Sequence, residues 1–328
     1  MMLLPVSCGQ DVSSVERFDG SFLDAFDTVT TIIGYAESAD EFSDTAEDVR
    51  SVLMEYHRLY DIYNTYEGIN NLKTVNDNAG KAAVKVDERI ISLLEFCKEM
   101  YYETDGKVNV CMGSVLRLWH DERTNALEYG NEGKIPKMDS LRKASLHTDI
   151  EKLIIDRENS TVYLADENMS LDVGAVAKGY ATQMLRASLG ENTVVSVGGN
   201  VISTGPKKDG EKWSIGIQDP FDQSASSHTV AISDEAVVSS GIYQRNYVAD
   251  GKVYHHLIDP ATLMPGEKYA AVTVIAHDSG ICDALSTALF LMDISEGEEL
   301  LGKYDAEAMW IFADGEEYFS DGYEKYVK

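Results

Sequence analysis

A carboxylate and a hydroxyl stand four residues apart in this sequence, as Asp283 and Thr287. The apolar residues around them recur at helical spacing, namely Ile281, Leu285, Ala288 and Met292. This pattern predicts a helix over 280–293 that buries the apolar stripe and presents Asp283 and Thr287 together on another face. Magnesium binds oxygen ligands, so the pair could hold Mg²⁺. A surface helix would show the same two residues, and the pair alone leaves both interpretations open.

A second stretch could bind phosphate. An apolar run ends at Asp172, and the small residues Gly174 and Ala175 precede a helical pattern that extends to about residue 189. We expect a strand end that leads into a helix over 174–189, with the free N–H groups of its first turn available to a phosphate. Tight packing of a strand against a helix would also explain the glycine.

Two adjacent glycines, Gly198 and Gly199, separate the strand-like segments 194–197 and 201–203. Such a pair is typical of a β-bulge, or of a place where a flat ligand lies against the backbone. The sequence alone leaves both interpretations open.

A third group flanks the turn dipeptide Asp250-Gly251, with Ser240-Gly241 and Arg245 before it and His256 after it. His256 could be a general base, a phosphate partner or a hydrogen-bonded strand residue. Adjacent strand residues point to opposite faces, so His255 and His256 are not expected to share one metal ion.

The charge balance restricts the partners. The 328 residues include 28 Lys and Arg against 56 Asp and Glu, a net charge of −28. A polyanion such as DNA would be repelled, which argues against nucleic-acid binding. A bound phosphate would need a local cation or backbone N–H groups, and a metal ion is the obvious candidate.

The elements that would position these residues indicate an α+β fold with mixed, largely antiparallel sheets and packed helices, because hairpins outnumber crossovers. A strand is expected over 26–33, and the residues 44–47 resemble a capping box that would start a helix. The tyrosines of that helix, Tyr56, Tyr60 and Tyr63, are interpreted as core packing. Further segments are expected as helices over 87–104, 113–122 and 139–147, a hairpin over 153–164, and strands over 213–217, 230–239, 271–275 and 308–312.

The first residues, Met1 to Gln10, resemble the last part of a bacterial lipoprotein signal in which Cys8 would carry the lipid. The alternative is a ragged N-terminus with an incidental thiol. We expect residues 1–20 to be a signal remnant and tether, flexible over 9–19, and residues 21–328 to be a single domain outside the cytoplasmic membrane. The other three cysteines lack Cys-x-x-Cys spacing, which argues against a zinc site, and Cys97 is expected to be a buried hydrophobe.

Five segments, taken in order, resemble the ApbE family of FAD:protein FMN transferases. They are 172–181, 196–200, Ser240-Gly241 with Arg245, 256–260 and 283–287. Weaker matches are Phe26-Asp27-Thr28, Asn64-Thr65-Tyr66 and 106–110. Two positions depart from the family pattern: Asp27 replaces a glycine, and Asn109 replaces an aspartate.

The resemblance implies an ApbE or T-fold-like architecture and Mg²⁺-dependent transfer of FMN from FAD to a Thr or Ser hydroxyl of an acceptor protein, with release of AMP. It implies that His256 and Asp283 are catalytic, and that Ala175 (through its carbonyl), Asp283 and Thr287 bind the metal. The residues it implies for FAD binding are Phe26, Tyr66, Lys107, Val108, Asn109, Asp172, Lys178, Gly198, Gly199, Ser240, Arg245 and Leu257.

The resemblance further suggests that the acceptor is a flavin-carrying subunit of a membrane redox complex or an extracellular electron-transfer lipoprotein. Two other functions remain open at this point. The protein could be an FAD pyrophosphatase that gives FMN and AMP, or a non-catalytic FAD-binding lipoprotein, for which the Asn109 change is the best hint.

Overall fold

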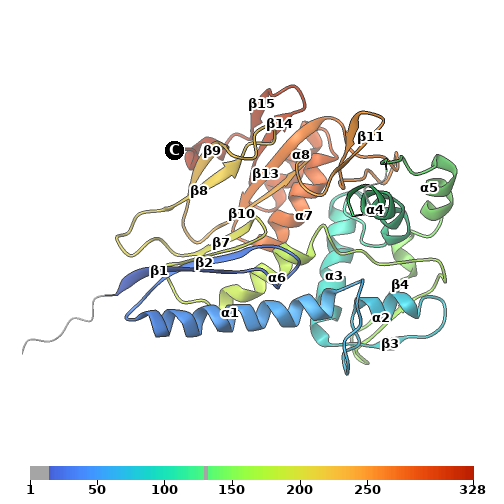
Figure 1. The fold of residues 1–328 in the computed structure, drawn as a ribbon, viewed down its shortest axis with the longest axis horizontal. Helices are drawn as coiled ribbons and strands as arrows, with labels where there is room; N and C mark the ends of the chain where they lie inside the picture. The colour runs from blue at the N-terminus through green and yellow to red at the C-terminus, as the bar shows by residue number, and fades with distance from the viewer. Residues whose placement is uncertain (1–14, 129–131) are drawn as a thin grey trace, which may run out of the picture.

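An eight-stranded antiparallel sheet is the centre of the molecule in the computed structural model, which describes residues 15–128 and 132–328 (Figure 1). The strand order is β1-β2-β6-β7-β10-β13-β14-β15. The strands are β1 (Glu16–Phe22), β2 (Thr30–Ala36), β6 (Thr193–Val197), β7 (Asn200–Thr204), β10 (Ala236–Gly241), β13 (Tyr269–Ala276), β14 (Glu307–Phe312) and β15 (Glu317–Phe319). The predicted α+β class is confirmed, with every pairing in this sheet antiparallel.

Helices cover one face of this sheet. They are α1 (Ala39–Tyr60), α6 (Ala177–Leu185), α7 (Ser279–Phe290) and α8 (Ile294–Lys303). A short 3₁₀ turn, η2 (Arg186–Ser188), continues α6. The sequence predicted that α7 buries a single apolar stripe. In the structure every residue from Cys282 to Phe290 is buried, so the burial of this helix is more extensive than predicted. The core between helices and sheet is the largest in the molecule.

A two-stranded ribbon and a short 3₁₀ turn cover part of the opposite face. They are β8 (Trp213–Gln218), β9 (Ser226–Ile232) and η3 (Tyr323–Tyr326). Figure 1 shows α1 along the lower side of the molecule and the β8–β9 ribbon at the upper left. In β2 the burial alternates: Ile32 belongs to the core under the helices, and Ile33 packs against the core under the ribbon. This period of two gives the sheet two different faces.

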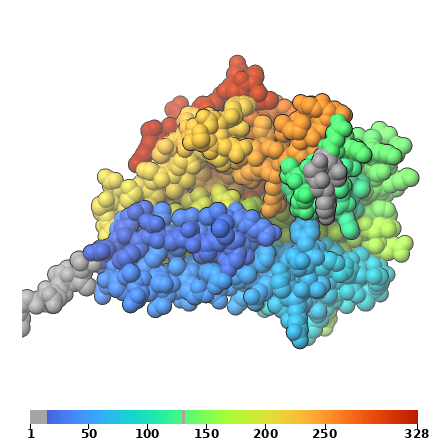
Figure 2. All heavy atoms as spheres, viewed as in Figure 1, coloured from blue at the N-terminus to red at the C-terminus, as the bar shows by residue number. Residues whose placement is uncertain are grey.

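The remaining elements gather beside the sheet. They are α2 (Leu72–Asp77), β3 (Val84–Lys85), α3 (Glu88–Glu103), α4 (Gly113–Leu127), α5 (Met138–Ser145), η1 (Ile150–Lys152), β4 (Leu153–Asp156), β5 (Thr161–Leu164), β11 (Tyr247–Ala249) and β12 (Lys252–Tyr254). In the space-filling view the blue-to-cyan N-terminal residues form the lower half and the yellow-to-red C-terminal residues the upper half (Figure 2). No helix in the described ranges is long and apolar enough to cross a membrane.

Several predicted boundaries were wrong near the N-terminus. Strand β1 begins at Glu16, so the last residues of the predicted 1–20 tether belong to the sheet, paired with β2. Cys8 lies outside the described residues. Phe26 and Asp27 have φ of 54° and 51°, a left-handed backbone that a strand does not allow, and β2 therefore starts only at Thr30.

Helix α1 begins at Ala39, well before the predicted start near residue 44. The Ser38 side chain accepts a hydrogen bond from the Glu41 N–H at 3.2 Å, so the N-terminal cap is Ser38 and the predicted capping box lies inside the helix. The helix ends at Tyr60. Tyr56 and Tyr60 are buried as expected, whereas Tyr63 lies beyond the helix and is 56% exposed, so its assignment to the core was wrong.

Candidate active site

A cleft beside α6 and α7 brings together all the predicted site residues except three. It encloses about 1210 Å³, counting the part open to solvent. Its lining includes Lys107, Val108, Asn109, Asp172, Ala175, Lys178, Gly198, Ser240, Arg245, His256, Leu257, Asp283 and Thr287. Phe26, Tyr66 and Gly199 do not line it. Residues far apart in the sequence therefore form one site.

The centre of the site is a close contact between α6 and α7 at Gly179. A Cβ atom on Gly179 would lie 2.3 Å from the Asp283 Cβ and 2.4 Å from the Ser279 carbonyl oxygen. Only glycine therefore fits here. The Gly179 N–H donates to Asp283 Oδ2 at 2.7 Å, which fixes the carboxylate against the first turns of α6.

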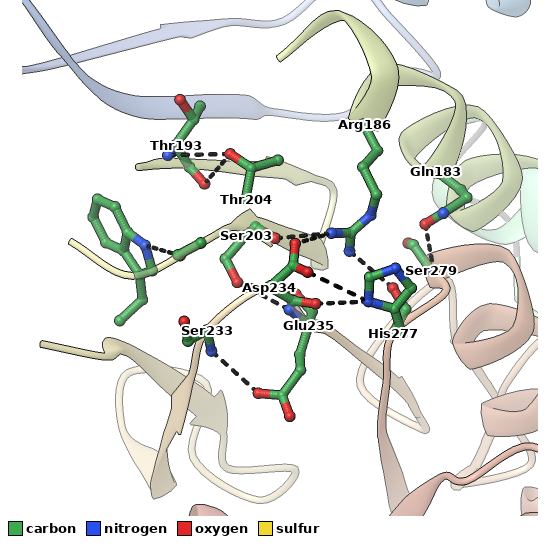
Figure 3. A network of polar contacts seen from close by, with 12 residues as sticks. Gln183, Arg186, Thr193, Ser203, Thr204, Ser233, Asp234, Glu235, His277 and Ser279 are labelled. Carbon is green, nitrogen blue, oxygen red and sulfur yellow. Dashed lines mark hydrogen bonds and ion pairs between the residues drawn. The ribbon is translucent and has the colours of Figure 1, made fainter. Parts of the chain in front are cut away.

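A polar network holds the far end of α6 against the segment that starts α7 (Figure 3). The Arg186 guanidinium donates to the Asp234 carboxylate at 2.6 Å and to the His277 carbonyl at 2.8 Å. The Gln183 amide oxygen accepts the Ser279 N–H at 3.0 Å. Since Asp283 lies one turn after Ser279, these bonds help to set the position of Asp283 in the cleft.

Asp283 is 4% exposed, and burial raises the pKa of its carboxyl group. The positive charge of Lys178, the Gly179 N–H and the charge of Arg245 act in the opposite direction. A carboxylate in this environment is costly to keep charged unless a cation is bound. Asp283 is thus suited to hold a cation in front of a phosphate.

Hydroxyl groups continue the oxygen-rich surface from Asp283. Ser240 Oγ lies 2.8 Å from Ser286 Oγ and 3.5 Å from Thr287 Oγ1, and Ser286 donates to the Asp283 carbonyl at 2.9 Å. Within the described ranges no group of three His, Cys, Asp or Glu residues could hold a metal. The predicted ligands are instead one carboxylate, one hydroxyl and the Ala175 carbonyl, all oxygen donors, and this chemistry fits Mg²⁺.

The strand predicted before α6 does not form, and the amides there are already occupied. The Leu171 N–H and C=O bond to the Asn76 side chain, at 2.7 and 3.0 Å, because the segment runs past a helix end rather than along a strand. The N–H groups of Gly174 and Ala177 donate to Asp172 Oδ1 and the Val173 carbonyl. The expectation of a free first turn for a phosphate was therefore wrong for these amides and for Gly179.

Two arginines provide the positive charge that those amides cannot. Arg245, with φ of 45°, and Arg123 of α4 both line the cleft. Burial, followed by the charge of Arg245, lowers the pKa of Arg123. Among residues 15–128 and 132–328 no carboxylate forms an ion pair with either guanidinium. Two unpaired cations in an acidic protein favour an anionic ligand.

The sequence reasoning missed Arg123 and its neighbours His120 and Tyr63. The helix was predicted to end at residue 122, one residue before Arg123, whereas α4 continues to Leu127. Arg123 Nη2 lies 3.0 Å from His120 Nδ1, and the rings of His120 and Tyr63 lie with centroids 5.3 Å apart at a tilt of 33°. The sequence signal that could have found this group was the continuation of the helix past residue 122, which places His120 and Arg123 on adjacent turns.

A second hollow of about 720 Å³ adjoins the cleft and shares Tyr63, Asp172, Lys178 and Arg245 with it. Phe26 lines this hollow, where its N–H donates to His57 Nδ1 at 3.2 Å.

Tyr66 lines neither space, but it contacts Asp61, which lines the second hollow. Its hydroxyl donates to Asp61 Oδ2 at 2.7 Å. Burial would raise the pKa of Asp61, but hydrogen bonds from the Tyr63 N–H, Tyr66 and Asn64 lower it, so this carboxylate stays charged at the hollow.

Asn109 has a structural role that explains its departure from the family pattern. Its amide group donates to the Thr148 carbonyl at 3.0 Å, and its Oδ1 accepts the Cys111 N–H at 2.9 Å. An aspartate could not donate the first bond. Beside it, Lys107 forms an ion pair with Asp259, with Nζ 3.3 Å from Oδ1.

The two histidines follow strand β12, which ends at Tyr254, and bond to different carbonyl groups. His255 Nε2 lies 2.8 Å from the Gly266 carbonyl, and its Nδ1 accepts the Leu257 N–H at 3.3 Å, so both nitrogens serve the local fold. His256 Nδ1 donates to the Gln244 carbonyl at 3.1 Å. Burial, then the charges of Arg245, His255 and Lys178, lowers the pKa of His256 to about 3. His256 is thus neutral at ordinary pH.

Gly198 and Gly199 form a hairpin turn, not the β-bulge considered from the sequence. Both have positive φ, 56° and 92°, in a two-residue loop between the paired Val197 and Asn200. A Cβ at Gly198 would approach Thr28 Oγ1 to 2.5 Å. The turn presents Asn200 to the cleft, where Asn200 is 2% exposed and its Oδ1 has no hydrogen-bond partner.

These features define an antiparallel α+β protein with a cationic, oxygen-lined cleft suited to a phosphorylated ligand. The chain belongs to the ApbE family, whose sequence profile matches residues 26–310. It is 31% identical over 263 residues to the FAD:protein FMN transferase of Treponema pallidum, a match that covers 74% of this chain and 71% of that protein. The Escherichia coli (strain K12) FAD:protein FMN transferase is 26% identical over 268 residues, covering 78% and 74%.

Solved structures agree. The ApbE protein of Thermotoga maritima superposes with a TM-score of 0.85 at 27% identity, covering 95% of this chain and 100% of that one. The Vibrio cholerae flavin transferase ApbE gives 0.78 at 22% identity, covering 95% and 100%, which supports the fold alone. The resemblance inferred from the five ordered segments is confirmed.

Proposed function

We propose that this protein transfers FMN from FAD to a Thr or Ser hydroxyl of an acceptor protein and releases AMP, with Mg²⁺. The acceptor oxygen forms a bond to the phosphorus of the FMN half, the pyrophosphate P–O bond breaks, and AMP leaves. The observation that carries the proposal is the buried Asp283 carboxylate, fixed by Gly179 on α6 and facing a cleft that contains Lys178 and Arg245.

The roles of the side chains follow from charge. A bound Mg²⁺ would neutralise charge that develops on the phosphate oxygens. Asp283, Thr287 and the Ala175 carbonyl supply its protein ligands, and Asp283 alone among them carries a full charge. Lys178 and Arg245 hold the pyrophosphate, since phosphoryl transfer depends mainly on positioning and charge neutralisation.

We propose that His256 receives the proton of the acceptor hydroxyl, although it is a weak base without bound phosphate. Its pKa is about 3. A general base is most effective when its pKa lies near the working pH, which is far above this value. Phosphate bound next to Arg245 would offset part of the repulsion that lowers this pKa. We expect His256 to become more basic when FAD is bound.

Detection of a covalent FMN adduct on an acceptor distinguishes the transferase from a pyrophosphatase and from a non-catalytic flavin-binding protein. FAD, Mg²⁺ and the protein are incubated with a candidate acceptor and analysed by mass spectrometry. FMN on a Thr or Ser of the acceptor together with free AMP supports the transferase. Free FMN and AMP alone would show a pyrophosphatase, and neither product would indicate a non-catalytic flavin-binding protein. Asn109, the sequence hint for the last alternative, lines the cleft and also forms two hydrogen bonds of the local fold.

The acceptor and the cellular location are part of the proposal. A flavin-carrying redox subunit or an electron-transfer lipoprotein outside the cytoplasmic membrane would be the acceptor, and a lipid on Cys8 would hold the enzyme at the same surface. Because β1 begins at Glu16, the tether would end before that residue. Membrane fractionation of the full-length protein and its Cys8→Ala variant tests this, and unchanged membrane association of the variant would reject the anchor.

A further inference from the structure

A groove on the ribbon-covered face of the sheet adjoins the active-site cleft. Its space is about 1100 Å³, and it shares Gly198, Ser239 and Gln244 with the cleft. The floor is the sheet, through residues such as Thr31 of β2 and Ser196 of β6, and the roof is the inner side of β8. The groove and the cleft therefore adjoin each other at the Gly198-Gly199 turn.

The groove reaches the cleft next to His256. The Gln244 carbonyl, which accepts the His256 Nδ1–H at 3.1 Å, belongs to a residue that lines both spaces. A chain lying in the groove would thus arrive beside the group proposed to receive the acceptor's proton. FAD itself would occupy the cationic cleft, so the groove is left for the second substrate.

The chemistry of the groove differs from that of the rest of the surface. None of the side chains that line it is charged, although 26% of the chain is Asp, Glu, Lys or Arg. The lining consists of Gly, Ser, Thr, Val, Ile, Gln and Tyr. A pyrophosphate would find no positive charge here, whereas a neutral peptide with small side chains would lose little solvation on binding.

The floor of the groove is only partly covered. Thr31, Ile33 and Ser196 point to the ribbon face and remain partly exposed, and Gly199 at the junction has no atom within 4 Å of the position of a Cβ. An extended chain could lie over this floor at the distance of packed β layers, about 10 Å. The sheet face offers side-chain contacts rather than a free edge, so recognition would depend on the size and charge of the occupant.

We propose that this groove binds the acceptor protein, as an extended, uncharged segment of small residues that delivers its Thr or Ser hydroxyl past the Gly198-Gly199 turn into the cleft. This inference rests on the proposed transferase function and names the partner of that same site.

The test uses two groove variants and a matched control. Ser196→Tyr and Thr31→Tyr fill the floor, and within the described part of the chain neither side chain forms a hydrogen bond that the change would break. Thr161→Tyr places the same ring on a partly exposed strand position of the small β3-β5-β4 sheet. Tyrosine is favourable in strands, so all three variants should fold.

The probes are short capped peptides of Gly, Ala and Val with one central Thr, and a matching set with Lys or Asp on both sides of the Thr. Mass spectrometry measures FMN-peptide, and fluorescence quenching measures FAD affinity. We expect the wild type and Thr161→Tyr to modify the neutral peptides in preference to the charged ones. The two groove variants should lose about tenfold or more of this transfer, a loss on the scale of one binding contact, with FAD affinity within about twofold of the wild type.

Two results would overturn the groove: full transfer by Ser196→Tyr and Thr31→Tyr, or equal modification of charged and neutral peptides. A wild type that binds FAD and releases AMP but modifies no acceptor would instead show a pyrophosphatase and reject the transferase function on which the groove rests. A parallel loss of FAD affinity in the groove variants would assign the groove to FAD instead. Failure of the wild type to bind FAD at all would reject the transferase function itself, which is a different result from each of these.

Discussion

The two faces of the central sheet differ in burial, hydrogen bonding and charge. On the helix-covered face, Ser240 and Ser286 are buried in a chain of hydrogen bonds that leads to Asp283, and Gly179 leaves no space for an added atom. On the ribbon-covered face, Thr31 and Ser196 are partly exposed and line an open, uncharged groove. One face is thus packed tightly around a buried carboxylate, whereas the other leaves an uncharged space beside the cleft.

The largest expected effect is on the helix-covered face. Asp283→Ala should lower turnover by about 10³-fold, because it removes the only full charge among the proposed metal ligands, a loss of several kcal/mol. Excess Mg²⁺ should rescue Thr287→Ala in part and Asp283→Ala poorly. AMP release measured against Mg²⁺ concentration checks both variants. Near wild-type turnover of Asp283→Ala at moderate Mg²⁺ would remove the metal site and the placement of the pyrophosphate.

His256, at the boundary between the two faces, should matter less. We expect His256→Ala to lower transfer by about 10²-fold or less, the low end of general-base catalysis, because its pKa is depressed. The same AMP-release assay, run with and without acceptor, measures the effect. A loss larger than that of Asp283→Ala would reverse the order of the two roles.

Gly179→Ala tests how rigid the helix-covered face is. The added methyl group would meet the Asp283 Cβ and a backbone oxygen, so the free energy of unfolding should fall by about 1–3 kcal/mol. Gly302→Ala in α8 is the control, since no atom lies near its added Cβ and alanine favours a helix. Denaturant unfolding measures the free energy of unfolding of both variants and of the wild type. Equal stability of the two would show that α6 and α7 can separate freely.

Acid should destabilise the fold through His256. Its native pKa is about 3, and an unfolded histidine titrates near 6.5. Between these values the unfolded state binds the extra proton, so the free energy of unfolding falls as the pH falls, by up to about 1.4 kcal/mol per pH unit from this group. His256→Leu should show a shallower slope between pH 6.5 and the acid limit of the fold. Identical slopes in the two proteins would contradict the depressed pKa.

The smallest effect compares one serine from each face. Ser286→Ala removes hydrogen bonds to Ser240 and the Asp283 carbonyl and should cost about 1 kcal/mol. Ser196→Ala should change stability by less than about 0.5 kcal/mol, since Ser196 is partly exposed. Thermal unfolding in parallel measures the difference. Equal costs would mean that the two faces are equally ordered.

Local patterns alone determined much of this molecule. The helical spacing of apolar residues located α3 and α7, and the turn dipeptide Asp250-Gly251 located the β11–β12 hairpin. The antiparallel α+β class followed from the number of hairpins. The five ordered segments gave the family, because residues close in sequence carry each of them. These features depend on neighbours within a few positions, and the chain itself records those neighbours.

Tertiary structure decided the rest, since the deciding contacts join distant segments. The N–H group that donates to the Asp283 carboxylate belongs to Gly179, 104 positions away, and the charge of Arg245 acts on Arg123 of α4 only in the folded chain. The bonds of Asn109, the exposure of Tyr63 and the occupied amides before α6 depend likewise on partners that no spacing rule names. The uncharged groove is lined by residues of β2, β6 and β8, which lie far apart in the sequence. Burial and electrostatics at a site are sums over spatial neighbours, so only the fold can set them.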